Sequence, residues 1–432
     1  MSESSIAVGL LGCGNVGAAL VTRVDERRAE IASRTGITLD IRRIAVHATT
    51  KDRGVDVDPA IFTTDAATVV TDPDIDVVVE TIGGIEPARE LVLAALAHGK
   101  PVITANKELL ANHGVELYEA ADAAGVDLLF EAAVAGAIPL MRPLRESLVG
   151  EPITRVMGIV NGTTNYILSQ MSEHGESYQS ALAEAQSLGY AERDPTADVE
   201  GFDAGAKAAI IATIAFGARV VAGDVYHEGI SSITETDIDF ASRLGFVVKL
   251  LAITEHVGDH DGQPVVAVRV HPAMIPATHP LAAVRDSFNA VFIEGTAAGE
   301  LMLYGRGAGG RPTASAVLGD LIDASSNKLA GTGASMGSLG RPHIQPIDEL
   351  VSAYYLNLEV TDEPGVLAKV ASIFGEHKVS IRSMEQEGLG NEARLIFITH
   401  AARERDVRST LHELGSLDSV RRIGSMLRVV GE

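Results

Sequence analysis

The chain has 432 residues, of which 46% are hydrophobic and 22% charged, a composition that supports two to three folded domains and excludes intrinsic disorder. Its 35 basic and 58 acidic side chains leave a formal net charge of −23. Such a chain repels phosphate backbones and anionic lipids, so we expect no nucleic acid and no membrane among its partners, and a solvated acidic surface.

The cysteine content and the hydropathy of the sequence indicate the cellular compartment of the protein. Cys13 has no partner for an internal disulfide, and no group of Cys and His residues has zinc-site spacing. No apolar run reaches the ~18 residues of a transmembrane helix, and the first residues lack the basic region of a signal peptide. We therefore expect a cytoplasmic protein.

Strand-like apolar runs alternate with helical stretches over residues 1–147. Because parallel strands need crossover helices, this alternation predicts a doubly wound α/β domain with helices on both faces of the sheet. The expected strands are Ile6–Leu11, Ile41–His47, Ile75–Glu80, Pro101–Thr104 and Asp127–Ala132, and the expected helices are Val16–Ser33, Glu86–His98 and Glu108–Ala124.

The rest of the chain contains two further regions that differ in composition. Residues 148–330 mix strands with long Ala-rich helices, which predicts an α+β substrate and dimerisation domain. Its expected elements are the strands Thr154–Val160 and Val265–His271 and the helices Gln179–Leu188 and Asp203–Phe216. Residues 331–350 are rich in Gly, Ser and Pro, which predicts a linker that lets the tail move.

The tail, residues 351–432, has the strand and helix order βαββαβ, which predicts a ferredoxin-like domain. Its expected elements, in chain order, are Tyr354–Val360, Val366–His377, Ile381–Glu387, Arg394–Thr399, Arg403–Leu414 and Met426–Val430.

A glycine-rich fingerprint joins the first expected strand to the first expected helix. Gly12 permits a tight turn, Gly14 lets a pyrophosphate approach the backbone, and Gly17 lets the helix pack against the sheet. The helix begins at Asn15 and Val16, whose free N–H groups would face the phosphates. We therefore expect a Rossmann-type NAD(P) site, with a purely structural turn as the alternative. Cys13 is expected to be a small packed residue.

The choice between NAD and NADP depends on the loop after the second expected strand. That strand ends without the acidic residue that usually holds the ribose of NAD, and Lys51 and Arg53 flank Asp52 just beyond it. Two cations at this point favour the 2′-phosphate of NADP. The alternative, that both are solvated loop charges, leaves NAD open.

Two more motifs follow strands of the expected parallel sheet, where ligands bind at the carboxyl ends. One is Glu80–Gly84 and the other is Thr104–Lys107. Their candidate cofactor contacts are Thr81, Gly83, Thr104 and Lys107. The alternative is that Lys107 is an exposed surface lysine without a functional role.

Three polar motifs in the second domain are candidates for a substrate site. Residues 161–166, with Thr163, suit a binding loop or a helix N-cap. Asp203 and Lys207 lie four apart on a helix and can pair, either as proton-transfer groups or as an exposed ion pair. The glycines of Gly305–Pro312, including Gly309, suggest close approach of the backbone to a ligand or to the other domain.

Jointly, these motifs resemble those of homoserine dehydrogenases. The resemblance spans residues 6–346 and rests on GLLGCGNVG, TANK, EAAVAGAIP, NGTTNYIL, LGYAERDPTADVEGFDAGAKAAI and GRGAGGRPTAS. The tail, with the turn and helix start Asp362–Leu367, is similar to an ACT domain, a small-molecule regulatory module. An aspartokinase segment is missing, so the resemblance is to the monofunctional form.

This resemblance implies an oxidoreductase that interconverts L-homoserine and L-aspartate 4-semialdehyde with NAD(P)(H) in threonine and methionine biosynthesis. It implies that Lys207 exchanges a proton with the substrate oxygen, that Lys107 lies by the nicotinamide and the substrate, and that Asp203 supports Lys207. Implied substrate contacts are Glu192, Asp198, Lys107, Thr163 and Tyr190.

The resemblance also implies a sodium ion, an effector and an oligomer. The ion would be held by Glu131 and by backbone carbonyls of Val134, Gly136 and Ile138. L-threonine is the expected effector of the tail, and a homodimer or homotetramer is the expected assembly. The alternatives are a catalytically silent nucleotide-binding amino-acid sensor and another amino-acid dehydrogenase. Intact Lys107 and Lys207 argue against the sensor.

Overall fold

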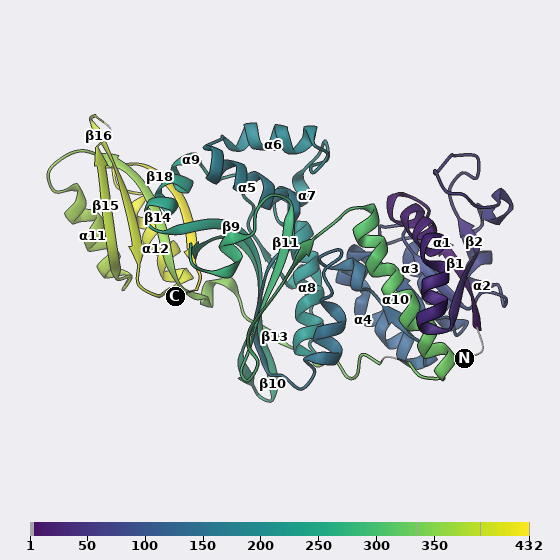
Figure 1. Cartoon of the computed structure of the whole chain (residues 1–432). Helices are drawn as coiled ribbons and strands as arrows, with labels where there is room; N and C mark the ends of the chain where they lie inside the picture. Colours follow the sequence, from purple (N-terminus) through teal and green to yellow (C-terminus); the bar gives the residue numbers. More distant parts are fainter. Residues whose placement is uncertain (1–3, 334, 389, 432) are drawn as a thin grey trace.

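The computed structural model describes residues 4–333, 335–388 and 390–431, which form an elongated molecule with two β-sheets (Figure 1). The first sheet has six parallel strands in the order β3-β2-β1-β4-β5-β6. Its strands are β1 (Ser4–Leu11), β2 (Ile37–Ala45), β3 (Phe62–Thr63), β4 (Val77–Glu80), β5 (Val102–Thr104) and β6 (Leu128–Leu129). The predicted doubly wound parallel sheet is confirmed.

Alternating side chains of this sheet reach two separate cores. Val77 and Val79 pack with α1 (Asn15–Thr35) on one face, whereas Val78 packs with the helices on the other. That second face is covered by α2 (Ala66–Thr71), α3 (Ala88–Ala97) and α4 (Lys107–Ala124). Burial of both faces explains why these strands are continuous apolar runs.

Helix α10 (Gly310–Ala330) corrects the predicted domain division. Its residues Ala314, Val317 and Leu321 are fully buried in the core formed by α1 and the parallel sheet. Residues 148–330 were expected to form one substrate domain, but the last helix of that range returns to the nucleotide-binding sheet. The chain therefore passes between the two domains three times: before β7 (Ile153–Ile159), before α10 and after α10.

Strand β2 begins four residues earlier than the predicted Ile41. Ile37 and Leu39 are buried, but half-exposed residues separate them, so an apolar-run criterion misses this part of the strand. Helix α2 was not expected either. Asp65 accepts hydrogen bonds from the backbone N–H groups of Ala67 and Thr68 at its start, which is an N-cap signal that the sequence does carry.

The second sheet runs through the middle of the molecule and continues into the C-terminal domain (Figure 1). Its main path is β12-β11-β7-β9-β10-β18-β14-β16-β15. The middle part contains β7 (Ile153–Ile159), β8 (Tyr226–His227), β9 (Phe246–His260), β10 (Gln263–Pro276), β11 (Phe288–Gly295) and β12 (Gly299–Arg306). The helices beside it are α5 (Gly162–His174), α6 (Tyr178–Ser187), α7 (Thr196–Val199), α8 (Phe202–Phe216) and α9 (Glu235–Arg243).

The C-terminal domain has the predicted βαββαβ order. Its elements are β14 (Val351–Thr361), α11 (Val366–Glu376), β15 (Ile381–Gly388), β16 (Glu392–Thr399), β17 (Ala402–Arg403), α12 (Glu404–Leu414) and β18 (Val420–Val429). Strand β18 pairs in parallel with β10 through Ala273–Arg428 and Met274–Val429. The C-terminal sheet is therefore continuous with the sheet of the middle domain.

The linker that was expected to let the tail move is held against the middle domain. β13 (His343–Ile344) pairs with β10, and the side chain of Arg219 donates to the carbonyl of Leu339 at 3.2 Å. The composition correctly predicted irregular backbone. It did not predict these attachments, because they depend on residues about 70 to 120 positions earlier in the chain.

Buried charges join the C-terminal domain to the middle domain. Arg428 is fully buried; it donates to Glu404 of α12 at 2.7 and 2.6 Å and to Glu228 at 2.7 Å. Asp237 of α9 accepts hydrogen bonds from Tyr355 and from Ser425. Such groups are stable in a protein interior only when all of them are paired, so they fix how the two domains fit together. Among the described residues, no helix has both the length and the hydropathy needed to span a membrane.

Candidate active site

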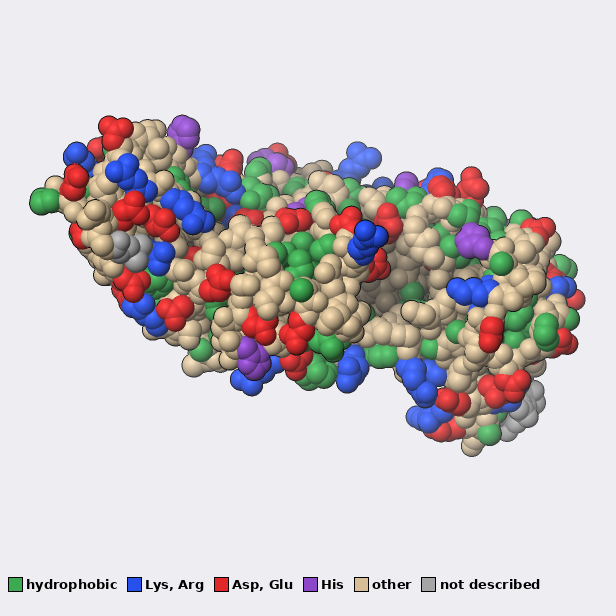
Figure 2. Space-filling view, turned by 90° about the horizontal axis from the view of Figure 1, so that it is seen from above, with side chains coloured by type: hydrophobic (Ala, Val, Ile, Leu, Met, Phe, Trp, Pro, Cys, Tyr) green, Lys and Arg blue, Asp and Glu red, His purple; other side chains and the backbone are tan. Residues whose placement is uncertain are grey.

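A cleft of about 1140 Å³ lies between the nucleotide-binding domain and the middle domain. The start of α4 forms one wall and α8 forms the opposite one, with the 188–198 loop and the Arg306–Gly309 turn completing it. Figure 2 shows a hollow near the middle of the molecule, and acidic and basic side chains interspersed over the surrounding face. The acid excess on this face is therefore spread over the surface, as expected.

Two lysines from different domains share one carboxylate inside the cleft. Lys207 donates to Oδ2 of Asp203 at 2.7 Å and to the carbonyl of Val160 at 2.6 Å. Lys107, at the start of α4, donates to the other carboxylate oxygen. Asp203 and Lys207 are each 8% exposed. The predicted pairing on one helical face is confirmed, but the pair is buried, so the alternative of an exposed ion pair is wrong.

Burial and neighbouring charges set the protonation of this cluster. Burial lowers the pKa of Lys207, Asp203 raises it and Lys107 lowers it, and the net result is below the ordinary lysine value. Burial also acts to lower the pKa of Lys107, but Asp203 and Asp198 outweigh it and the pKa is raised. The two ammonium groups hold the pKa of Asp203 well below its usual range despite its burial. Of the two lysines, Lys207 is therefore the one with the lower pKa and loses its proton more readily.

Asn161, which is missing from the predicted site residues, connects two acids of the cleft. Its side-chain N–H donates to Asp198 at 2.7 Å and to Asp203 at 2.9 Å. Its amide oxygen accepts from the N–H and the hydroxyl of Thr164 and so caps α5. The N-cap interpretation of this motif is confirmed, and the same side chain also contacts two acids of the cleft, so capping does not exclude a place in a binding loop.

The other predicted substrate contacts line the same cleft. Glu192 is exposed at its mouth, and Tyr190 is partly exposed. Thr163 is buried and donates its hydroxyl to the carbonyl of Tyr190 at 2.7 Å, so it holds the 188–198 loop in place. Burial raises the pKa of Asp198, whereas the hydrogen bond from Asn161 lowers it.

The glycine-rich loop has the geometry that a dinucleotide needs. A side chain on Gly12 would meet the carbonyl of Thr81 at 2.8 Å, and one on Gly17 would meet the carbonyl of Gly12 at 2.4 Å. A side chain on Gly14 would have no neighbouring atom within 4 Å, so the backbone at Gly14 borders open space. No side chain caps α1 beyond Gly14, which leaves the N–H groups at Asn15 and Val16 available to an anion.

A second helix begins beside the first. A side chain on Gly310, at the start of α10, would lie 3.0 Å from the carbonyl of Asn15. Its N-cap Gly309 lines the cleft with φ +122°, and no side chain caps this helix. Two helix N-termini therefore lie side by side, and both favour negative charge.

Two predicted cofactor contacts are turned away from the cleft. Thr104 is fully buried and donates its hydroxyl to Glu80 at 2.5 Å, so its side chain cannot contact a cofactor in this structure. The hydroxyl of Thr81 donates to the carbonyl of Gly12 at 3.0 Å. Glu80 accepts the N–H of Gly83 at 3.1 Å. These side chains hold the edge of the sheet in shape, and the backbone of Gly83 remains exposed.

The loop after β2 places one of its two cations near the glycine-rich loop. Arg53 donates to the carbonyls of Ala48 and Lys51 at 2.7 and 2.6 Å. Its charge acts on the thiol of Cys13, where burial raises the pKa and Arg53 lowers it. Lys51 is exposed. Cys13 is 6% exposed, which confirms that it is a packed residue.

The Glu131 carboxylate is already occupied by backbone N–H groups. Its two oxygens accept from Leu140, from Met141 at 2.7 Å and from Arg142 at 2.9 Å. In the part of the chain that the structure describes, no group of three or more His, Cys, Asp or Glu residues could hold a metal ion. A cation at this segment would therefore depend on backbone carbonyl oxygens rather than on this side chain.

Several cleft residues were not predicted at all. Phe202, His227, Ser287, Asn289 and Arg306 line the cleft. The ring of His227 lies so close to α8 that a side chain on Gly205 would meet its Nε2 at 1.9 Å. Arg306 belongs to the glycine-rich motif that the sequence analysis singled out. Phe202 precedes the predicted Asp203 in the quoted motif, whereas His227, Ser287 and Asn289 have no local signal, since strands and loops far apart in the sequence bring them together.

A parallel sheet with an open glycine-rich loop beside a cleft that holds a buried lysine is typical of NAD(P)-dependent dehydrogenases. Models of the homoserine dehydrogenase NAD-binding domain, of homoserine dehydrogenase and of the ACT domain match residues 12–131, 139–322 and 354–418. A homoserine dehydrogenase of Corynebacterium glutamicum is 50% identical over 428 residues, which cover 99% of this chain and 96% of the relative. The chain belongs to the homoserine dehydrogenase family.

Solved structures agree with this membership. The crystal structure of a homoserine dehydrogenase from Thiobacillus denitrificans is 40% identical, has a TM-score of 0.91 and covers 99% of both chains. A hyperthermophilic archaeal homoserine dehydrogenase mutant in complex with NADPH is 28% identical, has a TM-score of 0.61 and covers 74% of this chain and 98% of that one. The chain is thus an NAD(P)-binding enzyme of amino-acid biosynthesis with a C-terminal ACT domain.

The contacts of Asn161 predict a positioning role that can be separated from helix capping. Asn161→Ser keeps an oxygen that can cap α5 but removes the donor to Asp198 and Asp203. A hydrogen bond to a charged group contributes about 1.5–3 kcal/mol, so kcat/KM for homoserine should fall about 10- to 100-fold. Because Asn161 lowers the pKa of Asp198, any pH-profile limb due to that acid should move to higher pH.

Ser177→Ala is the matched control for this substitution. It removes the cap of α6, where Ser177 accepts the N–H of Ser180, and does not touch the cleft. It should lower the melting temperature without changing kcat/KM. Equal pH profiles for Asn161→Ser and the wild type would leave Asn161 with a capping role alone.

Proposed function

We propose that this enzyme interconverts L-homoserine and L-aspartate 4-semialdehyde with NADP(H), and that Lys207 exchanges the proton of the substrate oxygen. The observation that carries the proposal is the buried cluster in which Lys107 and Lys207 share Asp203 inside the interdomain cleft. A bound nicotinamide supplies the hydride acceptor or donor.

Lys207 can work in both directions because its pKa lies below that of an ordinary lysine. In the reduction, the ammonium form donates a proton to the aldehyde oxygen as hydride reaches the carbonyl carbon. In the oxidation, the neutral amine takes the hydroxyl proton as hydride leaves the same carbon. Asp203 keeps Lys207 aimed at one place through the hydrogen bond of 2.7 Å.

The remaining residues of the cleft suit the charges of an amino-acid substrate. Glu192 and Asp198 offer carboxylates to the substrate ammonium group, and Asn161 keeps Asp198 oriented. Lys107 stays cationic because Asp203 and Asp198 outweigh the effect of its burial, and it lies at the border with the nucleotide-binding domain. We assign it the contact with both substrate and nicotinamide.

Replacement of Lys207 tests this assignment directly. Lys207→Met keeps most of the packing volume and removes the proton-exchanging group, so kcat should fall by about 10²–10⁴-fold. The KM for NADPH should stay close to that of the wild type. Lys100→Met is the matched control, because Lys100 is another buried lysine, 4% exposed, and its ammonium binds the carbonyls of Asp72 and Ile75 away from the cleft.

The pH profile supplies the second part of this test. Asp203 raises the pKa of Lys207, so Asp203→Asn should lower that pKa further. Homoserine oxidation needs the neutral amine, and its acid limb should therefore shift to lower pH by about one unit or more. Near-normal turnover in Lys207→Met, or a limb that stays in place in Asp203→Asn, contradicts the assignment.

NADP rather than NAD is the proposed cofactor. The support is the pair of cations after β2 and the proximity of Arg53 to the glycine-rich loop, where its charge acts on Cys13. An archaeal relative was solved in complex with NADPH.

Substitution of the two cations tests the cofactor preference. Lys51→Ala combined with Arg53→Ala should raise the KM for NADPH about tenfold or more and leave the KM for NADH nearly unchanged. Arg53 also braces its own loop through Ala48, so Arg53→Lys, which keeps the charge, separates the two roles. Equal kcat/KM values of the wild type for both cofactors count against the preference.

We also propose a sodium ion at residues 131–138, held by backbone carbonyl oxygens. Carbonyl oxygens are hard donors that suit a hard cation. The carbonyls of Val134, Gly136 and Ile138 are candidates, whereas the carboxylate of Glu131 already accepts three N–H groups. The ion would then brace the segment that leads from β6 into the middle domain.

We propose L-threonine as an effector of the ACT domain and a homodimer or homotetramer as the assembly. Gly365, with φ +89°, precedes α11, and no side chain caps that helix. The free N–H groups there suit an amino-acid carboxylate. For the assembly, the support is edge strand β12, which leaves Leu301 and Tyr304 exposed.

A charge at the start of α11 tests the effector site. Gly365→Asp places a carboxylate where the effector carboxylate is proposed to bind, so the half-inhibitory threonine concentration should rise at least about tenfold. Gly375→Asp is the control, because it places the same charge in the last turn of the same helix, where Gly375 is exposed. A point substitution is preferable to truncation, since removing the tail would expose the β10 edge. Equal inhibition of both variants contradicts this site.

A further inference from the structure

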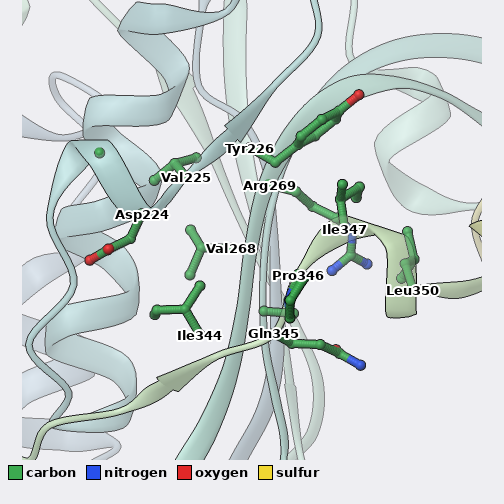
Figure 3. Close-up of a pocket in the computed structure, with 12 residues that line it drawn as sticks. Asp224, Val225, Tyr226, Val268, Arg269, Ile344, Gln345, Pro346, Ile347 and Leu350 are labelled. Atoms are coloured by element: carbon green, nitrogen blue, oxygen red, sulfur yellow. The ribbon is translucent and has the colours of Figure 1, made fainter. Parts of the chain in front are cut away.

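A second cavity, of about 230 Å³, lies between the middle domain and the linker that leads to the ACT domain. It is bounded by β8, β10 and residues 344–350 (Figure 3). Most of its wall is aliphatic, contributed by Val225, Val268, Ile344, Pro346, Ile347 and Leu350. Nothing in the reaction described above uses this space.

One buried cation, Arg269, reaches into this cavity. It lies on β10 with 5% of its surface exposed, and its guanidinium points toward the linker beside Pro346 and Ile347 (Figure 3). Nη1 lies 2.6 Å from the carboxylate of Glu255, and both Nη1 and Nε are closely covered by surrounding atoms and make no well-aligned hydrogen bond among the described residues. Buried donors without a partner are rare in proteins, and the planar guanidinium fork matches a carboxylate.

We propose that this cavity binds a small monocarboxylate with a short branched aliphatic body, amino acids of that shape included. Arg269 would hold the carboxylate, and the aliphatic wall would exclude water from the body of the ligand. The cavity is smaller than the roughly 300–1,000 Å³ of pockets for drug-sized ligands, which restricts the occupant to this size. The site is separate from the effector site proposed at Gly365.

The position of the cavity couples it to both the active site and the ACT domain. Gly223 and Val225 line this cavity and the active-site cleft. On β8, Tyr226 borders the cavity while the next residue, His227, lines the cleft. The hydroxyl of Tyr226 accepts from Arg408 of the ACT domain at 2.9 Å. An occupant would therefore alter homoserine turnover, a consequence that rests on the proposed function, whereas binding itself does not.

Calorimetric titration of the full-length protein tests the site with three probes of similar shape. Isovalerate carries only the carboxylate, L-valine carries the carboxylate and an ammonium group, and isobutylamine carries only the ammonium group. We expect saturable binding of isovalerate and L-valine and none of isobutylamine. Ile347→Trp, which fills the cavity and leaves Arg269 intact, and Arg269→Gln should each weaken isovalerate binding at least tenfold. The control Gly365→Asp should bind it as the wild type does.

Three results would overturn the proposal: no saturable isovalerate binding, binding that survives both cavity variants, or binding that only Gly365→Asp abolishes. Because Ile347→Trp spares the Arg269–Glu255 ion pair, a folding defect in Arg269→Gln alone cannot mimic the expected pattern. Absence of homoserine turnover with intact probe binding would refute the proposed function and leave this site standing.

Discussion

The carboxylate of Asp203 is the constraint on which the active site depends. One of its oxygens binds Lys207 from the same helix, and the other binds Lys107 from the nucleotide-binding domain. Asp203 and Lys207 are each 8% exposed and stabilise each other, because either one alone would be a buried charge without its partner, whereas Lys107 reaches Asp203 from the half-exposed border of the cleft. The pairing therefore fixes the distance between the two domains at the point where cofactor and substrate must meet.

The local parts of the fold and site could be predicted from the sequence, and the long-range parts could not. The glycine-rich loop and the i,i+4 pair of Asp203 and Lys207 are short-range patterns, so their geometry follows from neighbouring residues. The bridging role of Asn161 depends on Asp198 and Asp203, which lie 37 and 42 positions away. Strand β12, with its half-exposed and exposed residues, has no apolar alternation strong enough to reveal an edge strand.

The linker is a second feature that the sequence could predict only in part. Its Gly, Ser and Pro content correctly predicted irregular backbone, but mobility depends on what that backbone contacts. Pairing of β13 with β10 and of β18 with β10 joins the ACT domain to the middle domain through continuous sheet. Only two residue pairs join β10 to β18, so the buried ion pairs of Arg428 must supply much of the orientation. The sheet connection between the ACT domain and the middle domain is thus narrow.

Net charge and local charge lead to different conclusions about phosphate binding in this molecule. A chain with a net charge of −23 is a poor partner for a polyanion, whose contacts extend far beyond any single site. A dinucleotide is smaller, and charges more than about 8 Å away from it are largely screened at physiological salt. The groups that lie around the glycine-rich loop are the backbone at Gly14, the N-termini of α1 and α10 and the guanidinium of Arg53. An acidic surface that disfavours a polyanion therefore need not oppose a dinucleotide, because the charges that act on the dinucleotide lie within a few ångströms of the glycine-rich loop.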